Sequence, residues 1–517
     1  MIPALLGIII AFSITAVSIV QVTTNNFFVT GNIVKSQQAF NVAESGLNYY
    51  LWHLNHKATD YKDGGTTPTT PDPNLGYGPY THTYTDTTGK NQGTYTLWVK
   101  PAGAGSTMVT VRSIGVAAGS NIKRTIQAQI GSPSFANYAV VSDVALWFGN
   151  TESASGPVHS NQGVRMDGSS TSTVSSANAT YVPSSQIGGN GSTSRPGVWC
   201  SSSVTSPTDC NTRSKTSWTY PVSTVDFNQV SSSLCAMKKV AFTDYSNTSA
   251  LASQANACTQ EPATRTNAYL PKRAASFSAS RGYLVVLNPN DSYNLYNVNA
   301  ENDQLSPYTS ALTLQLVANN IALPPSDVLF AEDNVWVLSN PNFKGRVTIG
   351  AGRLASSNSS TYANVVISGP LVYSTKDGSD AVGLVAQDSV IVAPYAPPSS
   401  GSFNFEVDGA LLAQTGSVGY PGRYKTNSNR CTRGWTNSNQ QMTFYGSVAS
   451  RQTWTWTWLN GSSPCGDASF SSGNGYVSGV LNNSTQYDYN LKYAPPPSYP
   501  ITAGYNILSW REILTKP

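Results

Sequence analysis

Histidines, the side chains most often used for acid–base chemistry near neutral pH, are rare in this chain. There are four, His53, His56, His82 and His159. His53 and His56 are three residues apart and share one face of a predicted helix, but no acidic residue lies on the same turn. This pattern is more typical of solvated histidines at a helix end than of a metal site. His159 falls in a predicted turn of a β-helix, where a structural hydrogen bond is its expected role.

The acidic residues also lack the arrangement of an active site. Glycoside hydrolysis needs two carboxyl groups on either side of one bond, and one acidic pair in the later part of the chain is Asp377 with Asp380. They lie in Lys-Asp-Gly-Ser-Asp (376–380), a composition typical of a turn. Oxygens that converge in such a turn make it a weak calcium candidate, although the EF-hand spacing is absent. We therefore expect no enzyme and no cofactor, with calcium as the one alternative.

The cysteines are expected to form disulfides. There are six, Cys200, Cys210, Cys235, Cys258, Cys431 and Cys465. None belongs to a Cys-x-x-Cys pair, which argues against zinc, and an even number in an exported chain favours disulfides without deciding their pairing. Pairing of nearest neighbours predicts Cys200–Cys210, Cys235–Cys258 and Cys431–Cys465. Six buried thiols are the alternative.

Three tryptophans alternate with threonines in Arg-Gln-Thr-Trp-Thr-Trp-Thr-Trp (451–458). A period of two places Trp454, Trp456 and Trp458 on one face of a strand. One interpretation is a packed core face beside the Cys431–Cys465 excursion. The other is an exposed aromatic surface that contacts glycans or a neighbouring subunit.

The elements that position these residues begin with a long apolar run. No charged residue precedes Lys35, and residues 1–22 are almost continuously apolar, enough for one helix to cross a bilayer. The run lacks the basic leader and the cleavage site of a secretory signal. Whether a leader is removed before Met1 stays open, and a simple membrane anchor is the alternative. The large apolar side chains of the run include Ile2, Leu5, Leu6, Ile8, Ile9, Ile10, Phe12, Val17, Ile19 and Val20.

A second helical stretch follows the apolar run. Its apolar residues recur at helical spacing, at Phe40, Ala43, Leu47, Tyr50, Leu51 and Leu54. This amphipathic half should pack its stripe on a globular head. Residues 23–32, between the two halves, contain several β-branched and polar residues plus Gly31, which are weaker helix formers. We expect the helix to unwind there.

The combination of an apolar half with Gln-Ala-Phe-Asn-Val-Ala-Glu-Ser-Gly-Leu (38–47) resembles the N-terminal helix of type IV pilins, specifically the PilX-type pilus assembly proteins. Three later segments resemble coils of the large, β-helix-bearing members of that group: 157–161, 383–387 and 408–414. One departure is Leu5, which stands where the main pilins carry a glutamate that pairs with a neighbour's N-terminal amine. This departure favours a tip or atypical subunit.

The chain is predicted to be α+β and mostly β, in four regions. These are a pilin helix over 1–55, a pilin-like antiparallel meander over 56–132, a β-helix-like domain over 133–420, and a C-terminal β region over 421–517. From about residue 134, short strands recur without helical stretches, as in the stacked coils of a parallel β-helix. A β-sandwich is the alternative. Residues 186–280, with four cysteines, are interpreted as an insertion.

Composition favours an extracellular protein. Charged residues make up 11% of the chain, against roughly 25% in typical soluble domains, and Tyr and Trp are plentiful. The net charge of +4 is small and dispersed, so no nucleic-acid surface is indicated.

The resemblance implies a structural subunit of a type IV pilus-like filament. Such a subunit is held in the cytoplasmic membrane before assembly and then joins other pilins at the cell surface, where its β head serves adhesion or motility. An inner-membrane assembly platform and a prepilin peptidase are the implied partners. The alternative is a filament-tip or membrane-anchored adhesin that binds host glycan or protein. A β-helix polysaccharide enzyme on a stalk is disfavoured by the missing acid–base cluster.

Overall fold

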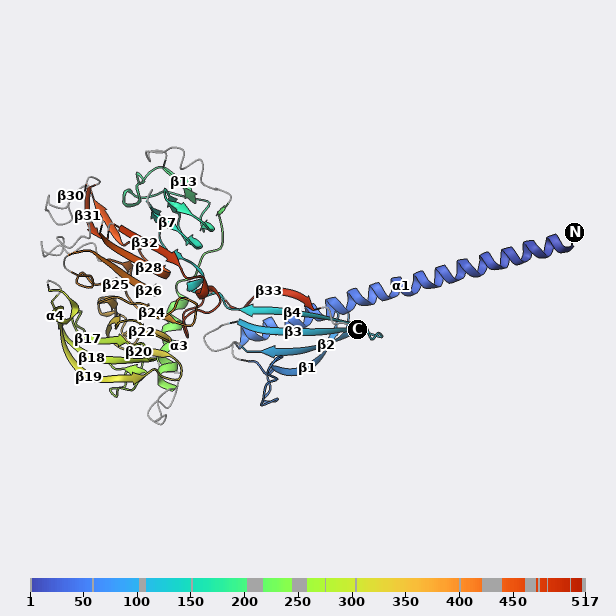
Figure 1. Cartoon of the computed structure of the whole chain (residues 1–517), viewed down its shortest axis with the longest axis horizontal. Helices are drawn as coiled ribbons and strands as arrows, with labels where there is room; N and C mark the ends of the chain where they lie inside the picture. Colours follow the sequence, from blue (N-terminus) through green and yellow to red (C-terminus); the bar gives the residue numbers. More distant parts are fainter. Residues whose placement is uncertain are drawn as a thin grey trace. The chain divides into compact units, whose positions relative to one another are not determined.

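The structure is a computed structural model in which the chain divides into two compact units (Figure 1). One unit comprises Met1–Ser132 and Gly504–Pro517, and the other comprises Pro133–Ala503. The structure describes residues 2–57, 60–101, 108–149, 152–201, 217–243, 258–274, 276–302, 305–398, 401–420, 439–460, 471–472, 475–480, 482–502 and 504–513.

The first element, α1 (Ile2–His56), is one uninterrupted helix. The expected unwinding at 23–32 is wrong, because all of these residues are helical, and two polar side chains there bond to the helix itself. The hydroxyls of Thr23 and Thr24 donate to carbonyls one turn earlier, at 2.7 and 2.8 Å. These bonds satisfy the side chains and leave the backbone ladder intact. Gly31 costs about 1 kcal/mol relative to alanine, too little to interrupt a helix of this length.

An antiparallel sheet completes the first unit. Its strands are ordered β1 (Tyr77–Thr85), β2 (Asn91–Lys100), β3 (Met108–Ala117), β4 (Lys123–Gly131) and β33 (Asn506–Ile513). Strands β2 and β3 alternate between buried and half-buried positions, as expected for a sheet with one face on the core. The meander expected over 56–132 is thus present as β1 to β4. The expected boundary of a C-terminal region over 421–517 is wrong, because β33 pairs with β4 in the first unit.

The second half of α1 packs on this sheet. Its buried residues are Ala39, Val42, Ala43, Gly46, Leu47, Tyr50 and Leu54. Most of them share one core with sheet residues such as Leu97 and Ile130. The close approach requires Gly115 in β3, because a Cβ there would overlap backbone atoms of Ala39 and Ala43. The predicted amphipathic stripe is therefore confirmed.

Two large sheets with mainly parallel strands dominate the second unit. The first contains β15 (Trp218–Thr219), β11 (Val174–Ser176), β8 (Val158–Ser160), β5 (Val140–Ser142), β28 (Gln440–Ser450), β26 (Phe403–Ala413), β24 (Ala381–Ala386), β22 (Arg346–Ala351), β20 (Val328–Ala331), β16 (Tyr269–Leu270) and, beside β28, β32 (Asn482–Tyr487). The second contains β19 (Leu312–Ala322), β18 (Ser292–Glu301), β17 (Gly282–Leu287), β21 (Asn334–Ser339), β23 (Val365–Ile367), β25 (Val390–Val392) and β27 (Val418–Gly419).

Consecutive strands from β20 to β27 alternate between these two sheets. Each pairs in parallel with the strand two elements later, as β20 pairs with β22 and β21 with β23. This is the connectivity of stacked β-helix-like coils, and it differs from the antiparallel pairing of a β-sandwich. At the edge of the second sheet, β17, β18 and β19 pair antiparallel.

The coils do not stack in sequence order. In the first sheet, β5, β8 and β11 follow one another on one side of β28. The strands β26, β24, β22, β20 and β16 follow one another on its other side. The two runs meet where Val140 of β5 pairs with Val448 of β28. Smaller sheets complete the unit: β6 (Leu146–Phe148), β9 (Val164–Met166) and β14 (Val198–Trp199); β7 (Ser153–Ala154) with β10 (Ser169–Ser170); β12 (Thr180–Tyr181) with β13 (Arg195–Pro196); and β29 (Thr457–Asn460), β31 (Gly475–Gly479) and β30 (Ser471–Ser472).

The described residues within 186–280 are part of this architecture rather than a separate insertion. Strand β14 pairs with β9, and β16 pairs with β20. Between them lies α3 (Gln229–Thr243), a helix that was not expected. A further short helix is α4 (Tyr308–Ala311). The apolar residues of α3 recur at helical spacing and are buried, which is a signal that the sequence interpretation did not use: Val230, Leu234, Met237 and Ala241.

Two cores flank the first sheet. In β24 all six residues are buried; Leu384 belongs to the main core, and Val385 to a second core shared with α3. Burial on both faces explains why such strands read as continuous apolar runs without alternation.

Candidate assembly surface

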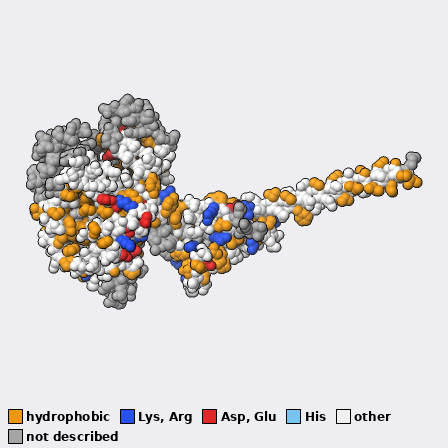
Figure 2. All heavy atoms as spheres, viewed as in Figure 1, with side chains coloured by type: hydrophobic (Ala, Val, Ile, Leu, Met, Phe, Trp, Pro, Cys, Tyr) orange, Lys and Arg blue, Asp and Glu red, His pale blue; other side chains and the backbone are white. Residues whose placement is uncertain are grey.

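The first half of α1 presents apolar side chains that no described part of the chain covers (Figure 2). Every residue from 2 to 34 is exposed. The apolar residues predicted for this surface are all more than half exposed, from 52% at Ile10 to 83% at Ile2. A continuous apolar surface without charges marks a site of association with lipid or protein. Among the described residues, α1 is the one helix long and apolar enough to cross a membrane.

The boundary between the free and docked halves of α1 lies at its first charged residue. Lys35 Nζ donates a hydrogen bond to Ala118 O at 2.7 Å, at the end of β3. At the next residue, Ser36 Oγ accepts a hydrogen bond from Arg124 Nη1 at 2.7 Å, and the Arg124 guanidinium also forms an ion pair with Glu512 of β33. The docked half is therefore fixed to the sheet by polar bonds as well as by its core. A fixed second half gives the free half a defined direction from its own sheet.

The end of α1 is held by a cluster that the sequence did not reveal. Asp63 lies at its centre, with Oδ1 accepting from the Tyr49 hydroxyl at 3.0 Å and Oδ2 lying 2.7 Å from His82 Nε2. His53 lies 3.6 Å from both Asp60 and Asp63. The expectation of a solvated His53 is wrong, because its acidic partners come from the loop after the helix. No set of three His, Cys, Asp or Glu in the described chain is arranged to hold a metal.

The other two histidines of interest have structural roles. His56 is exposed, as expected, with Nδ1 2.8 Å from Trp52 O. His159 in β8 is buried, and its ring nitrogens lie 3.0 Å from Ser175 Oγ and 3.0 Å from Asn161 Oδ1. Burial lowers the pKa of His159 below its ordinary value, which favours the neutral ring. The predicted structural hydrogen bond is confirmed.

The calcium candidate is a hydrogen-bonded turn. Asp377 Oδ1 accepts from the Ser379 N–H at 2.9 Å and from the Ser379 hydroxyl at 2.6 Å, and these bonds lower the pKa of Asp377. Asp380 accepts from the N–H groups of Gly345 and Thr375, each at 2.8 Å. Donors of the turn together with the Gly345 N–H bond to both carboxylates.

The tryptophan segment belongs to the core rather than to an exposed surface. Trp456 is 3% exposed, and its ring lies 5.5 Å from that of Phe444. Trp454 is half-buried, with its ring 5.4 Å from Phe148. The core interpretation is therefore confirmed for Trp456, and the alternative of an exposed contact is wrong for that residue. The expected continuous strand is also absent, because β29 begins only at Thr457. The Trp458 side chain lies outside the described residues.

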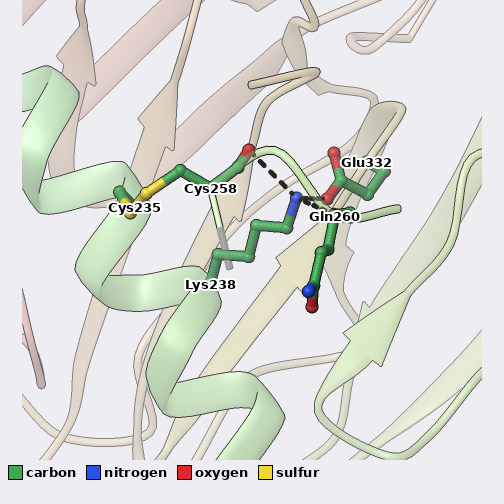
Figure 3. Close-up of a disulfide and its surroundings, with 5 residues drawn as sticks. All are labelled: Cys235, Lys238, Cys258, Gln260 and Glu332. Atoms are coloured by element: carbon green, nitrogen blue, oxygen red, sulfur yellow. Dashed lines mark hydrogen bonds and ion pairs between the residues drawn. A yellow bond between two sulfur atoms is a disulfide. The ribbon is translucent and has the colours of Figure 1, made fainter. Parts of the chain in front are cut away.

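One of the predicted disulfides is confirmed. Cys235 of α3 is bonded to Cys258, with their Cα atoms 5.1 Å apart (Figure 3). Cys200 is also disulfide-bonded. Cys210, Cys431 and Cys465 lie outside the described residues, so the pairings Cys200–Cys210 and Cys431–Cys465 stay predictions.

A buried ion pair lies beside this disulfide. Lys238 of α3 and Glu332, which follows β20, form an ion pair with both side chains fully buried. Lys238 Nζ also donates to Gln260 O at 2.6 Å (Figure 3). Burial lowers the pKa of Lys238 and raises the pKa of Glu332 to about 7. The pair joins α3 to the first sheet, and no sequence pattern pointed to it.

Among known proteins, the likeness found is distant and structural. No protein-family model matches the chain, and no curated protein sequence matches it. Among solved structures, the competence-associated pilin ComZ from Thermus thermophilus is similar over 93% of this chain and 98% of its own, at 12% sequence identity and a TM-score of 0.29. A likeness this distant carries no argument about function.

Proposed function

We propose that this chain is a structural subunit of an extracellular type IV pilus-like filament, assembled through the free half of α1. The observation that supports this proposal is one continuous helix whose first half is exposed and uncharged while its second half is built into the core of a small β sheet. Lipid covers the apolar half before assembly. In the filament, the same surface of other copies covers it. Each methylene buried contributes roughly 0.8 kcal/mol.

The proposal also covers the cellular location of the protein and its partners. The subunit is inserted in the cytoplasmic membrane, processed by a prepilin peptidase and moved by an inner-membrane assembly platform into a filament with other pilins. The large β unit then faces outward and serves adhesion or motility. The role is structural rather than catalytic, and it needs no cofactor. A carbohydrate or protein of a host surface is the proposed ligand class.

Leu5 supports a second candidate, a filament-tip or membrane-anchored adhesin. The helix carries no carboxylate before residue 35 that could pair with a neighbour's N-terminal amine. A subunit without that pair has one fewer contact that fixes its register in a filament body. At a tip, only one side of the helix needs a neighbour.

The experiment is substitution of Ile9 by Asp in the full chain, expressed in its natural host. Ile9 is 55% exposed on the free half. A carboxylate at this depth costs about 2.5–3.5 kcal/mol in membrane insertion, and in a helix bundle each added subunit would repeat the cost of an unpaired charge. The matched control is Asn41→Asp, which places the same charge at an exposed position on the docked half.

We expect Ile9→Asp to remove the protein from sheared surface filaments while its β units stay folded. Asn41→Asp should assemble like the wild type. A simple membrane anchor predicts that wild-type protein never enters the sheared fraction. Finding it only as membrane-bound monomers would refute the filament proposal.

A further inference from the structure

A lysine and two carboxylates of different burial meet in the second unit. Glu406 and Asp408 are two residues apart on β26, so their side chains share one face of that strand. Lys376 comes from the turn before β24. Its Nζ lies 2.5 Å from Glu406 Oε1 and 3.1 Å from Asp408 Oδ1. One amine thus contacts both carboxylates.

The three side chains differ in their access to water. Asp408 is fully buried, whereas Lys376 and Glu406 are partly exposed, at 38% and 28% of their side-chain surfaces. Asp408 Oδ2 accepts the Tyr373 N–H at 2.9 Å, and the buried Oδ1 lies 3.1 Å from Lys376 Nζ. The Tyr445 ring covers Lys376, with Nζ 4.5 Å from its centroid. Burial raises the pKa of Asp408 to about 6, so part of this carboxyl is protonated near neutral pH.

We propose that Lys376 and Asp408 form an intramolecular amide (isopeptide) bond, with Glu406 as the proton-transfer group. The amine and the carboxyl are already in contact, which gives the reaction the advantage of an intramolecular step. The buried position of Asp408 shields the product from hydrolysis. Nothing in the proposal depends on the filament function.

The reaction is a balanced condensation. Burial lowers the pKa of Lys376, but its bonds to Glu406 and Asp408 more than offset this, so the ammonium must first lose a proton. Glu406 accepts that proton. The neutral amine attacks Cγ of protonated Asp408 and forms the C–N bond. Glu406 passes its proton to the departing hydroxyl, which leaves as water, and then takes the second proton that the attacking nitrogen loses. Glu406 therefore ends the reaction protonated, which balances the proton of the starting ammonium. One amine and one carboxylic acid give one amide and one water, with no oxidant or activating group.

The bond would close a loop across neighbouring coils. Between Lys376 and Asp408 lie β24 and β25, one strand from each large sheet. An amide joining the turn before β24 to β26 would hold this coil against the next when the chain is pulled. Such a covalent cross-link would raise the resistance of this unit to unfolding under mechanical load.

Peptide mapping of the purified full chain tests the proposal. After reduction and alkylation, trypsin should cut a chain without the bond into peptides 354–376 and 377–423, because Lys376 and Arg423 are the cleavage sites in this segment. With the bond, Lys376 is no longer a substrate. We expect one peptide, 354–423, lighter by one water than its linear mass.

Three variants test whether the loss of cleavage after Lys376 and the lower mass come from this bond. Lys376→Arg should restore cleavage after position 376 and the full mass, and Glu406→Ala should lose the bond through lack of proton transfer. Lys272→Arg, at the part-exposed ion pair with Glu261, should leave the bond intact. A succinimide at Asp408-Gly409 also loses one water, but it would leave cleavage at Lys376 unaffected. Linear peptides 354–376 and 377–423 at full mass from the wild type would overturn the proposal.

Discussion

At the scale of single residues, buried polar side chains in the second unit are paired by partners from other parts of the chain. His159 bonds to Ser175, one coil away, and to Asn161. Lys238 and Glu332 come from a helix and a sheet that are far apart in sequence. Because each of these groups is desolvated, its contribution to stability depends on the partner that the fold supplies.

His159 should make the chain sensitive to acid. Its folded pKa is lowered, so its contribution to stability is fully present above the ordinary value of 6.5 and is lost as pH falls through the folded value. The slope is at most about 1.4 kcal/mol per pH unit. We expect the free energy of unfolding, measured by urea titration below pH 6.5, to fall less steeply in His159→Gln than in wild type. Equal slopes in the two proteins would contradict this assignment.

The Lys238–Glu332 pair should show strong coupling. Lys238→Met leaves a buried carboxylate without its partner and should cost about 3–5 kcal/mol. The double variant Lys238→Met/Glu332→Leu should recover most of that loss, because no unpaired charge is left. Urea denaturation of the two single variants and the double variant gives the coupling energy. Losses that simply add would show that the pair is not coupled in solution.

The sequence alone predicted residue chemistry where the partner is local. The turn at Asp377–Asp380 and the structural role of His159 follow from residue type and near neighbours. The cluster of His53, His82 and Asp63 could not be predicted, because a helix end, a loop and a strand meet only in the fold. The burial of Trp456 was one of two open interpretations, since alternation does not say which face meets solvent.

At the scale of elements, α1 combines two surfaces on one rigid helix. Its free half carries only uncharged side chains, and its docked half enters the core of the meander. The helix continues through residues 23–32, and the hydroxyls of Thr23 and Thr24 bond to carbonyls of the preceding turn. An uninterrupted backbone transmits force from the assembly surface to the sheet.

Gly115 of β3 should be essential for this docking. A methyl group there would overlap the backbone of α1 at Ala39 and Ala43, which cannot move aside as a flexible side chain can. Gly115→Ala should therefore destabilise the helix–sheet contact by roughly 1–3 kcal/mol and speed hydrogen exchange in residues 39–54. Gly31→Ala is the control, because a Cβ there meets nothing within 4 Å. Unchanged exchange in Gly115→Ala would show that the helix is not packed this closely.

Periodicity predicted most elements but not their order in space. The helical stripe of residues 40–54 and the alternation in β2 and β3 led to the correct structures. Helix α3 was missed because its serines and lysines masked an apolar repeat. The return of β33 to the first sheet and the pairing of β5 with β28 are long-range contacts. No local pattern specifies which distant strand completes a sheet edge.

At the scale of the whole molecule, the central claim is that copies of this chain join through the free half of α1. The claim rests on an apolar surface that this chain's described residues leave uncovered. A membrane anchor needs that surface only in lipid, whereas a filament subunit needs it again outside the membrane. The two readings therefore differ in where the mature protein is found.

Immunogold electron microscopy of intact cells and sheared filaments, with antibodies against the β unit of residues 133–503, tests this claim most directly. The proposal predicts gold on filaments that extend beyond the cell, repeated along their length for a body subunit or confined to their ends for a tip subunit. Gold found only on the cell envelope, with every filament unlabelled, would contradict it.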